Sequence, residues 1–388
     1  MKLAFLGGAL DHICLPICES FHSLLGDNFI FVSSKPRSSS RTDLGYDSLN
    51  DKYPFVIKWY ENEKTALDII NNADVVIYGS APESIIRKRM LQNKLTFRFT
   101  ERLYKEPFNF SNFFRRLCGA LIHHGIYQGK NVHILCAGAY VATDFKKYNF
   151  YRDRFYKWCY FTQITDKSYN DLCKIKKDNK KVELIWTARF IPVKKPNLVI
   201  ELAQYLKERN IDFHINMVGG GELLDTVKKD AISSGIEDFI TFTGPISPES
   251  VREIMESADI SLFTSDRREG WGAVLNEAMG CGCACVASSA AGSSPFLIKH
   301  NKNGVLFDIN NKEDFFAKVY NLICDKKKIA ALGKTAYEDI HNFWTPSAAA
   351  KSFLKLAKSI LNNLPTPAEY GPCSIAPVLK DGWNIDEL

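Results

Sequence analysis

The 388-residue sequence contains no run of 18 or more apolar residues, so it predicts no transmembrane helix. Residues 1–8 are apolar but few, and Asp11 follows them closely. They therefore lack the long apolar segment and the cleavage site of a secretory signal peptide. We interpret residues 3–6 as a first β-strand instead. These two absences predict a cytoplasmic protein.

The cysteines give little support for a cysteine-based site. None of the 11 cysteines forms a CxxC pair, and their odd number fits a reducing compartment. The densest group, Cys281, Cys283 and Cys285, admits metal or redox chemistry, or else a tight turn that enters a buried strand. We favour the turn, because neither a histidine nor a second cysteine pair lies near the group to complete a site.

Apolar residues make up 46% of the chain and charged residues 24%, as in ordinary soluble globular proteins. The length exceeds what one hydrophobic core ordinarily supports, which predicts two domains. We place an N-terminal domain at residues 1–160 and a C-terminal domain at residues 161–345. A helix and tail at residues 346–388 are expected to return to the N-terminal domain.

The net charge of +6 is mild, but positive charge is concentrated between residues 87 and 116, where only Glu101 and Glu106 oppose it. The basic residues are Arg87, Lys88, Arg89, Lys94, Arg98, Arg102, Lys105, Arg115 and Arg116. The interleaved aromatics are Phe97, Phe99, Tyr104, Phe108, Phe110, Phe113 and Phe114. This mixture suits contact with anionic lipid or with nucleic acid, and it equally suits a solvated helix face above core aromatics. We expect no nucleic-acid partner.

Apolar segments of strand length alternate with helical segments along most of the chain. The expected strands are residues 3–6, 29–32, 73–78, 132–136, 182–186, 213–218, 239–242, 260–263, 284–287 and 304–307. The expected helices are residues 15–25, 197–209, 223–233, 250–257, 311–332 and 346–363. Continuous apolar strands separated by helices predict parallel sheets covered on both faces, which is an α/β fold.

The alternation breaks between about residues 148 and 181, where we place the interdomain linker. Five lysines lie near its end, around Asp178 and Asn179, and their setting favours a solvated turn. They are Lys174, Lys176, Lys177, Lys180 and Lys181. Ligands of open parallel sheets bind beyond the carboxyl ends of the strands, so we expect the functional residues of the second half to follow its strands.

Two elements of the second half place cations and glycines after expected strands. Arg189 and Lys194 follow residues 182–186, and two cations at this spacing can clamp a diphosphate or belong to a solvated loop. Gly219, Gly220 and Gly221 follow residues 213–218, where close approach of the backbone to a ligand is favoured. A dinucleotide fingerprint is incomplete there, because Leu224 occupies the last glycine position.

Two further elements follow later strands. Thr243, Gly244 and Pro245 form a turn that either is simply structural or presents backbone groups to a base. The segment from Glu269 to Glu277 includes Gly270, Trp271, Gly272 and Ala273 after another strand. We expect the glycines to open a helix whose first N–H groups favour phosphate, with a carboxylate at each end of the segment.

Taken together, these four elements resemble the C-terminal domain of family-4 retaining glycosyltransferases, which have two Rossmann-like domains with parallel sheets facing a central cleft, the GT-B arrangement. The resemblance covers about residues 182–344 and includes enzymes of capsule and exopolysaccharide assembly. It implies that Arg189 and Lys194 bind the donor diphosphate and that Glu269 contacts the donor sugar. Backbone groups of Trp271, Gly272 and Ala273 would meet sugar or phosphate, Glu277 the ribose, and residues 243–246 the base.

The first half resembles the family less closely, as expected for an acceptor side. Gly7 and Gly8 after the first strand are similar to a glycine turn of the family near the donor phosphate. The family often places a histidine close to the sugar, and His12, His123, His124 and His133 are candidates. His123 and His124 also suit a helix end, where a cation is favoured.

The resemblance implies retaining transfer of a sugar from a nucleotide-diphospho-sugar to a hydroxyl of a glycan or lipid-linked saccharide. No metal or other cofactor is expected, because the chain has no DxD and two cations can serve the leaving diphosphate. Alternatives are a sugar-nucleotide epimerase or hydrolase of the same fold and a non-catalytic partner subunit. We expect a cytoplasmic protein, with peripheral contact to the inner face of an anionic membrane as a hypothesis.

Overall fold

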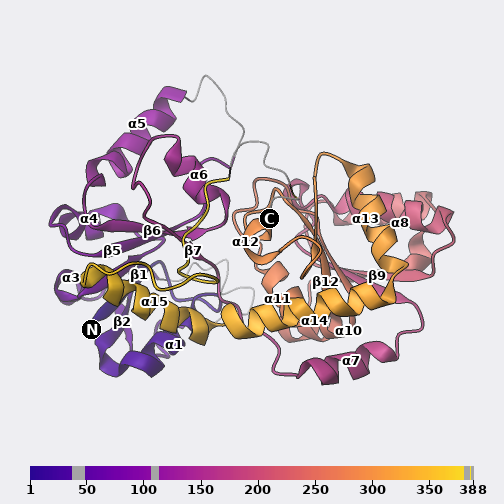
Figure 1. Ribbon diagram of the computed structural model, residues 1–388, viewed down its shortest axis with the longest axis horizontal. Helices are drawn as coiled ribbons and strands as arrows, with labels where there is room; N and C mark the ends of the chain where they lie inside the picture. Colours follow the sequence, from indigo (N-terminus) through magenta and orange to yellow (C-terminus); the bar gives the residue numbers. More distant parts are fainter. Residues whose placement is uncertain (37–48, 106–112, 380–384, 386–388) are drawn as a thin grey trace. The chain divides into compact units, whose positions relative to one another are not determined.

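A computed structural model describes residues 1–36, 49–105, 113–379 and 385. It divides into two compact units. The first unit consists of Met1–Thr162 with Phe343–Lys380, and the second contains Gln163–Asn342. Each unit is a parallel sheet with helices on both faces (Figure 1).

The sheet of the first unit has the strand order β3-β2-β1-β4-β5-β6-β7, and all neighbouring strands are parallel. Its strands are β1 (Leu3–Gly7), β2 (Phe29–Ser33), β3 (Val56–Lys58), β4 (Val75–Tyr78), β5 (Thr96–Thr100), β6 (Val132–Ala137) and β7 (Phe155–Trp158). Every residue of β1 and β6 is buried, which explains why both are apolar apart from His133 of β6.

The helices of the first unit are α1 (Leu15–Leu25), α3 (Glu63–Asn72), α4 (Glu83–Leu91), α5 (Phe113–His123), α6 (Tyr140–Lys146) and α15 (Pro346–Leu361). The late helix α15 packs on elements from the start of the chain. The ring of Phe353 lies 5.5 Å from that of Phe21 on α1 and 4.9 Å from that of Phe97 on β5. These aromatic contacts hold α15 in the core of the first unit.

The sheet of the second unit has the order β10-β9-β8-β11-β12-β13, again with parallel neighbours. Its strands are β8 (Val182–Thr187), β9 (Phe213–Val218), β10 (Ile240–Gly244), β11 (Ile260–Phe263), β12 (Ala284–Ser288) and β13 (Val305–Phe307). Its helices are α7 (Tyr169–Lys177), α8 (Pro196–Glu208), α9 (Leu224–Ser233), α10 (Pro248–Ser257), α11 (Val274–Gly280), α12 (Ser294–Leu297), α13 (Lys312–Ile323) and α14 (Lys326–Phe343).

Two helical predictions are wrong in detail. Lys174, Lys176 and Lys177 lie in helix α7 and not in a turn, because the Ser168 side chain caps that helix by accepting from the Asp171 amide. The single helix expected over residues 311–332 is two helices, α13 and α14. They separate at Asp325, whose carboxylate accepts from the Lys328 amide at the start of α14.

Three strands of the first unit were not predicted. Strand β3 is short and only half-buried, and β5 contains Arg98 between its phenylalanines. Strand β7 lies inside the segment that we had interpreted as an interdomain linker. Within the described ranges, no helix has the length and apolar character needed to cross a bilayer.

Candidate active site

The carboxyl edge of the second sheet is assembled by loops that are hydrogen-bonded to one another. The Ala188 amide donates to the Val218 carbonyl at 3.1 Å, and the Phe190 amide to the Gly220 carbonyl at 2.9 Å. The Gly219 amide in turn donates to the Gly244 carbonyl at 3.0 Å. The segments after β8, β9 and β10 therefore form one continuous backbone surface.

The glycines after β9 are required by this close approach. Gly219 has φ +131° and Gly221 φ +149°, a region that L side chains rarely adopt. A Cβ on Gly219 would overlap the Ala188 carbonyl oxygen, and one on Gly221 would lie 2.6 Å from the Phe190 carbonyl oxygen. The predicted glycine turn thus allows the loop after β8 to lie directly against the loop after β9.

The loop after β8 is also fixed to the loop after β11. The indole Nε1 of Trp186 donates to Thr264 Oγ1 at 2.8 Å, and Thr264 Oγ1 donates to the Lys194 carbonyl at 2.6 Å. The Asp266 amide donates to the Val193 carbonyl at 2.9 Å. These contacts set the backbone position of Lys194 before any ligand is bound.

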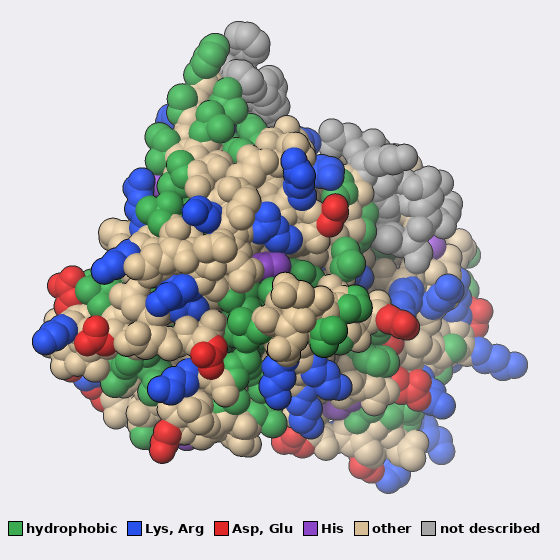
Figure 2. Space-filling view, turned by 60° about the vertical axis from the view of Figure 1, so that its left-hand side comes forward, with side chains coloured by type: hydrophobic (Ala, Val, Ile, Leu, Met, Phe, Trp, Pro, Cys, Tyr) green, Lys and Arg blue, Asp and Glu red, His purple; other side chains and the backbone are tan. Residues whose placement is uncertain are grey.

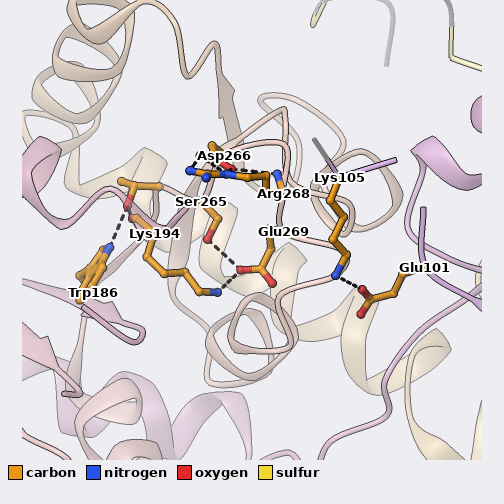
Figure 3. Close-up of polar contacts among 9 residues, drawn as sticks. Glu101, Lys105, Trp186, Lys194, Ser265, Asp266, Arg268 and Glu269 are labelled. Carbon is orange, nitrogen blue, oxygen red and sulfur yellow. Dashed lines mark hydrogen bonds and ion pairs between the residues drawn. The ribbon is translucent and has the colours of Figure 1, made fainter. Parts of the chain in front are cut away.

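Lys194 and Glu269 form an ion pair at this edge (Figure 3). Their side chains are only 13% and 16% exposed. Ser265 Oγ donates to the same Glu269 Oε2 at 3.1 Å, and the Glu269 amide donates to the Asp266 carbonyl at 3.0 Å. A half-buried ammonium and carboxylate are thus held together in one orientation, which reduces the reorganisation that binding a charged ligand requires.

Asp266 is held by its neighbour Arg268. The Arg268 Nη2 lies 2.8 Å from Asp266 Oδ2, and its Nε lies 3.2 Å from both carboxylate oxygens. Although burial opposes it, the contact with Arg268 lowers the pKa of the Asp266 carboxyl. This local pair stiffens the segment that leads to Glu269.

The segment between the two glutamates differs from the prediction. Helix α11 begins at Val274, so Trp271 and Gly272 precede the helix instead of opening it. Trp271 is buried, and its Nε1 donates to Asn276 Oδ1 at 2.9 Å. Gly272 has φ +89°, and a Cβ there would overlap the Phe263 ring. This turn places Ala273 directly before α11 and Glu277, half-buried, in the first turn of that helix.

The other predicted donor residues lie in the loops along the same edge. Arg189 is exposed after β8, while its expected companion Lys194 is engaged with Glu269. Gly270 is buried between Glu269 and Trp271. Thr243 Oγ1 donates to the neighbouring Gly244 carbonyl at 3.1 Å, which ends β10.

Pro245 follows β10 and lies against the glycine turn, where a Cβ on Gly220 would be 3.5 Å from the proline Cδ. The turn after β10 and the turn after β9 therefore contact each other.

In the first unit, Gly7 and Gly8 line a cavity of about 330 Å³ at the carboxyl edge of the sheet. The sequence motifs did not predict its polar residues, among them Asp11, Glu101 and Tyr160. Tyr160 Oη donates to Glu101 Oε1 at 3.0 Å, and Lys105 pairs with the other oxygen of Glu101 (Figure 3). Burial and the Glu101 charge both raise the pKa of Tyr160, so its hydroxyl stays protonated.

The candidate histidines lie in three different environments. His12 is exposed in the loop after β1 that also carries Asp11. His123 is exposed at the end of α5, with Nδ1 3.0 Å from Glu83 Oε2. His124 is buried, with Nδ1 3.0 Å from Tyr151 Oη. Burial, with Arg98 and His123 nearby, lowers the pKa of His124 to about 2, so this ring is neutral near pH 7.

His133 lies at the other end of the first sheet, near the start of β6. It is buried, with Nε2 3.0 Å from Asn131 Oδ1, and burial lowers its pKa to about 3. Both buried histidines therefore act as neutral hydrogen-bonding groups of the core.

The cysteine group is consistent with the structural interpretation. Cys281, Cys283 and Cys285 are buried at and before the start of β12, and burial raises the pKa of each thiol. Cys283 Sγ donates to the Met255 carbonyl at 3.1 Å. Among the described residues, no three His, Cys, Asp or Glu side chains gather as metal ligands. Metal independence stays a prediction.

Most of the second unit is similar in sequence to a known protein family. Residues 170–339 match the family described as "Glycosyl transferases group 1". This segment includes every predicted donor residue after Lys181, from Arg189 to Glu277.

Curated relatives match over a little less than half of the chain. A GDP-mannose-dependent alpha-(1-6)-phosphatidylinositol monomannoside mannosyltransferase of Mycobacterium tuberculosis is 26% identical over 181 residues, 44% of this chain and 47% of the relative. An N-acetyl-alpha-D-glucosaminyl L-malate synthase of Bacillus anthracis is 28% identical over 177 residues, 44% of this chain and 45% of the relative. The matched segment thus spans about half the length of these curated relatives.

Solved structures match over nearly the whole chain. Anabaena HepE in complex with UDP has a TM-score of 0.69 at 14% identity, covering 94% of this chain and 100% of that one. A sucrose-phosphate synthase from Thermosynechococcus elongatus has a TM-score of 0.64 at 13% identity, with the same coverage. The chain therefore has the two-unit α/β fold of the GT-B glycosyltransferases, and its second unit is similar to group 1 glycosyl transferases.

Proposed function

We propose that this protein is a retaining glycosyltransferase that moves a sugar from a nucleotide-diphospho-sugar to a hydroxyl acceptor. The observation that carries the proposal is the ion pair of Lys194 and Glu269, fixed at the carboxyl edge of the second sheet inside the segment similar to group 1 glycosyl transferases. Both side chains are held by loops that lie where open parallel sheets bind ligands.

In the proposed reaction, the bond between the anomeric carbon and the diphosphate oxygen breaks, and negative charge develops on the departing diphosphate. Lys194 and the exposed Arg189 supply positive charge to that diphosphate, which stabilises the transition state more than the ground state. The acceptor oxygen bonds to the anomeric carbon on the same face, and its proton passes to the leaving phosphate. No metal is required by this scheme.

The two glutamates have separate proposed roles. Glu269 accepts hydrogen bonds from hydroxyls of the transferred sugar while it orients Lys194. Glu277, half-buried in the first turn of α11, accepts hydrogen bonds from the ribose that stays with the nucleotide. Backbone groups of residues 271–273 would meet sugar or phosphate, the turn at residues 243–246 would hold the base, and Gly219 and Gly220 would allow close backbone approach.

The acceptor is assigned to the cavity at the carboxyl edge of the first sheet. Asp11, Glu101 and Tyr160 line this cavity of about 330 Å³, and carboxylates and a phenol are suitable partners for sugar hydroxyls. Gly7 and Gly8 form its turn after β1, with His12 on the same loop. We propose a glycan or lipid-linked saccharide of surface polysaccharide assembly as acceptor.

A panel of UDP-, GDP-, ADP- and dTDP-sugars tests the proposal, because a ligand that binds the folded state raises its stability by mass action. One nucleotide-sugar is expected to raise the melting temperature, and NMR with candidate acceptors should then show a product with the donor's anomeric configuration. An inverted product would overturn retention. The absence of binding to every member of the panel would favour a non-catalytic partner subunit, and donor turnover without transfer a hydrolase or epimerase.

We also propose peripheral contact with the inner face of an anionic membrane, through helix α5. Phe114, Leu121 and Ile122 on this helix are 69%, 47% and 54% exposed, and Arg115 is exposed beside them. Figure 2 shows hydrophobic and basic side chains together on one face of the molecule. An exposed apolar helix face with flanking arginine is typical of interfacial contact. Phe108 and Phe110 of the same sequence stretch lie outside the described residues.

Co-sedimentation with liposomes tests the membrane contact. Binding is expected to increase with anionic lipid and to fall when Phe114, Leu121 and Ile122 are replaced by serine. Ile232→Ser is the matched control, since Ile232 is 63% exposed on α9 of the second unit. Binding that ignores anionic lipid, or that the α5 variant leaves unchanged, would contradict the assignment.

A further inference from the structure

A second cavity, of about 380 Å³, lies at the amino edge of the second sheet, opposite the loops of the candidate active site. Helix α7 and the first turns of α14 form its walls, and residues at the starts of β8, β11 and β12 form its floor. Tyr169, Val182 and Ile329 supply an apolar surface. The volume is in the range of about 300–1,000 Å³ that small-molecule sites occupy.

Four lysines from three elements line this cavity. Lys176 and Lys177 come from α7, Lys181 precedes β8, and Lys326 begins α14. Within the part of the chain that the structure describes, no ion pair joins any of these four ammonium groups to a carboxylate. By contrast, Lys174 on the outer side of α7 pairs with Asp171 at 2.8 Å. The lining therefore sets four ammonium groups against one carboxylate, that of Asp259.

The single carboxylate of the lining, that of Asp259, accepts one backbone and one side-chain hydrogen bond. Its Oδ2 accepts from the Glu183 amide at 3.0 Å and from Asn179 Nδ2 at 3.1 Å. These bonds join the starts of β8 and β11. Asp259 thus has a structural role, and the cavity keeps an excess of cations over acids.

We propose that this cavity binds a small anion of the diphosphate class, with its phosphates on the lysines and an apolar part against Tyr169 and Ile329. Lysine ammonium groups recognise phosphate as point charges and need no fixed fork geometry, which suits a ligand held by flexible side chains. The site is distinct from the proposed donor site, because that site lies at the carboxyl edge of the same sheet.

The floor of the cavity is continuous with helix α11. Lys176 Nζ donates to the carbonyls of Cys281 at 3.1 Å and of Gly282 at 2.7 Å, directly after α11 ends. Gly282 has φ +67°, and a Cβ there would lie 3.2 Å from the Tyr169 ring. An anion that attracts Lys176 would compete with these two carbonyls for its ammonium group.

Cys173 provides a local reporter for the experiment. It lines the cavity and is exposed. Cys118, on α5 of the first unit, is also exposed but lies outside the lining. With inorganic pyrophosphate as probe, alkylation of Cys173 by iodoacetamide should slow about tenfold when the probe is at ten times its dissociation constant. Alkylation of Cys118, followed by mass spectrometry in the same sample, should keep its rate.

A lysine variant and a matched control complete the test. Replacement of Lys177, Lys181 and Lys326 by alanine should abolish the protection of Cys173. Replacement of Lys180, Lys327 and Lys328, which are exposed neighbours outside the lining, should preserve it. Both variants lose three positive charges, so a general electrostatic effect would reduce the protection of Cys173 equally in the two. That result would overturn the proposal.

Two further results would also overturn it. One is an alkylation rate of Cys173 in the unchanged protein that is the same in saturating pyrophosphate as in sodium chloride of equal ionic strength. The other is protection by vesicles of anionic lipid with none by soluble pyrophosphate, which would assign the lysines to a lipid headgroup. The readout does not depend on sugar transfer, so failure here leaves the proposed function intact, and failure of that function leaves this test valid.

Discussion

The two units use similar scaffolds but treat ionisable groups differently. In the second unit, Lys194 and Glu269 are paired at the carboxyl edge and keep their charges partly exposed. In the first unit, His124 and His133 are buried, and burial holds them in the neutral state. The carboxyl edge of the second sheet therefore carries a fixed ion pair, whereas these two histidines are neutral groups in the core of the first unit.

This difference is consistent with the proposed binding of the donor by the second unit and of the acceptor by the first. Charge that develops on a leaving diphosphate is best met by cations that are already in place. A neutral saccharide needs hydrogen-bonding groups in a shaped cavity, such as the one that Asp11, Glu101 and Tyr160 line. The comparison thus predicts that substitutions at the second edge change the chemical step most.

The largest effect is expected for Lys194→Ala. Loss of a preorganised cation should lower kcat by about 10²–10³-fold, the range seen when one group that stabilises developing charge is removed. It should also leave the Glu269 carboxylate with Ser265 as its remaining described side-chain partner. Steady-state kinetics with the nucleotide-sugar selected by the thermal panel would measure the change.

Lys195→Asn is the matched control for Lys194→Ala. Lys195 is the adjacent, exposed cation, and asparagine tolerates its φ of +52°. Near-normal turnover of Lys194→Ala would contradict the proposed role of Lys194. An equal loss of kcat in Lys195→Asn would show that Lys194 acts only as part of a basic surface.

The next effect concerns the turn before α11, through Gly272→Ala. The alanine would have to adopt φ +89°. Its Cβ would lie 2.8 Å from Phe263 Cε2 and would also overlap Cζ of the same ring. Overpacking of this kind adds about 1–3 kcal/mol to the backbone cost. Urea unfolding should therefore show a clear loss of stability in the second unit.

Gly244→Ala separates the two contributions to that loss. Gly244 has φ +70°, and a Cβ there meets no atom within 4 Å. Its substitution should cost only the left-handed backbone term of about 1–2 kcal/mol. Equal losses in the two variants would show that contact with Phe263 does not shape the turn.

Glu277→Ala should weaken donor binding while the fold stays intact. Hydrogen bonds to a charged group contribute about 1.5–3 kcal/mol, so calorimetry should find an affinity roughly ten- to a hundredfold lower. Glu338→Ala on α14 is the control, because Glu338 is an exposed carboxylate of the same unit. Unchanged nucleotide affinity in Glu277→Ala would end the ribose assignment.

The sequence predicted the second unit better than the first for a physical reason. Its glycines, cations and glutamates follow continuous apolar strands, so the position of each motif at the end of a strand could be predicted from the sequence. The pairing of Lys194 with Glu269 joins residues 75 positions apart, and it follows from the adjacency of β8 and β11 once the strand order is known. Ser265 was not predicted, because a serine in a polar loop carries no distinguishing pattern.

The polar cavity of the first unit could not be predicted in this way. Glu101 follows β5, whose apolar pattern is interrupted by the buried Arg98, so the strand was not recognised. Tyr160 lies 59 positions later, after a strand inside the supposed linker. The start of α11 was placed too early because a Gly-Trp-Gly turn and a helix start share the same local signals.

The smallest effect is expected for a buried histidine of the first unit, His124. Burial lowers the pKa of His124 to about 2, below the unfolded value of about 6.5, so the neutral ring contributes stability that is present above pH 6.5. Below pH 6.5 the unfolded chain gains a proton that the folded ring does not. His124→Gln should therefore reduce the pH dependence of unfolding by about 1.4 kcal/mol per pH unit between pH 6 and pH 4.

Hydrogen exchange at several pH values, read separately for peptides of each unit, measures this slope. His133→Gln should act in the same direction, because burial lowers the pKa of His133 to about 3. His341 of the second unit is half-buried, and its pKa is lowered against the opposing bond to the Gly280 carbonyl, so its removal should change the slope less. An unchanged slope in His124→Gln would mean that the ring becomes protonated in the folded state. The first unit would then carry a charged group in its core, and the contrast with the charged edge of the second unit would weaken.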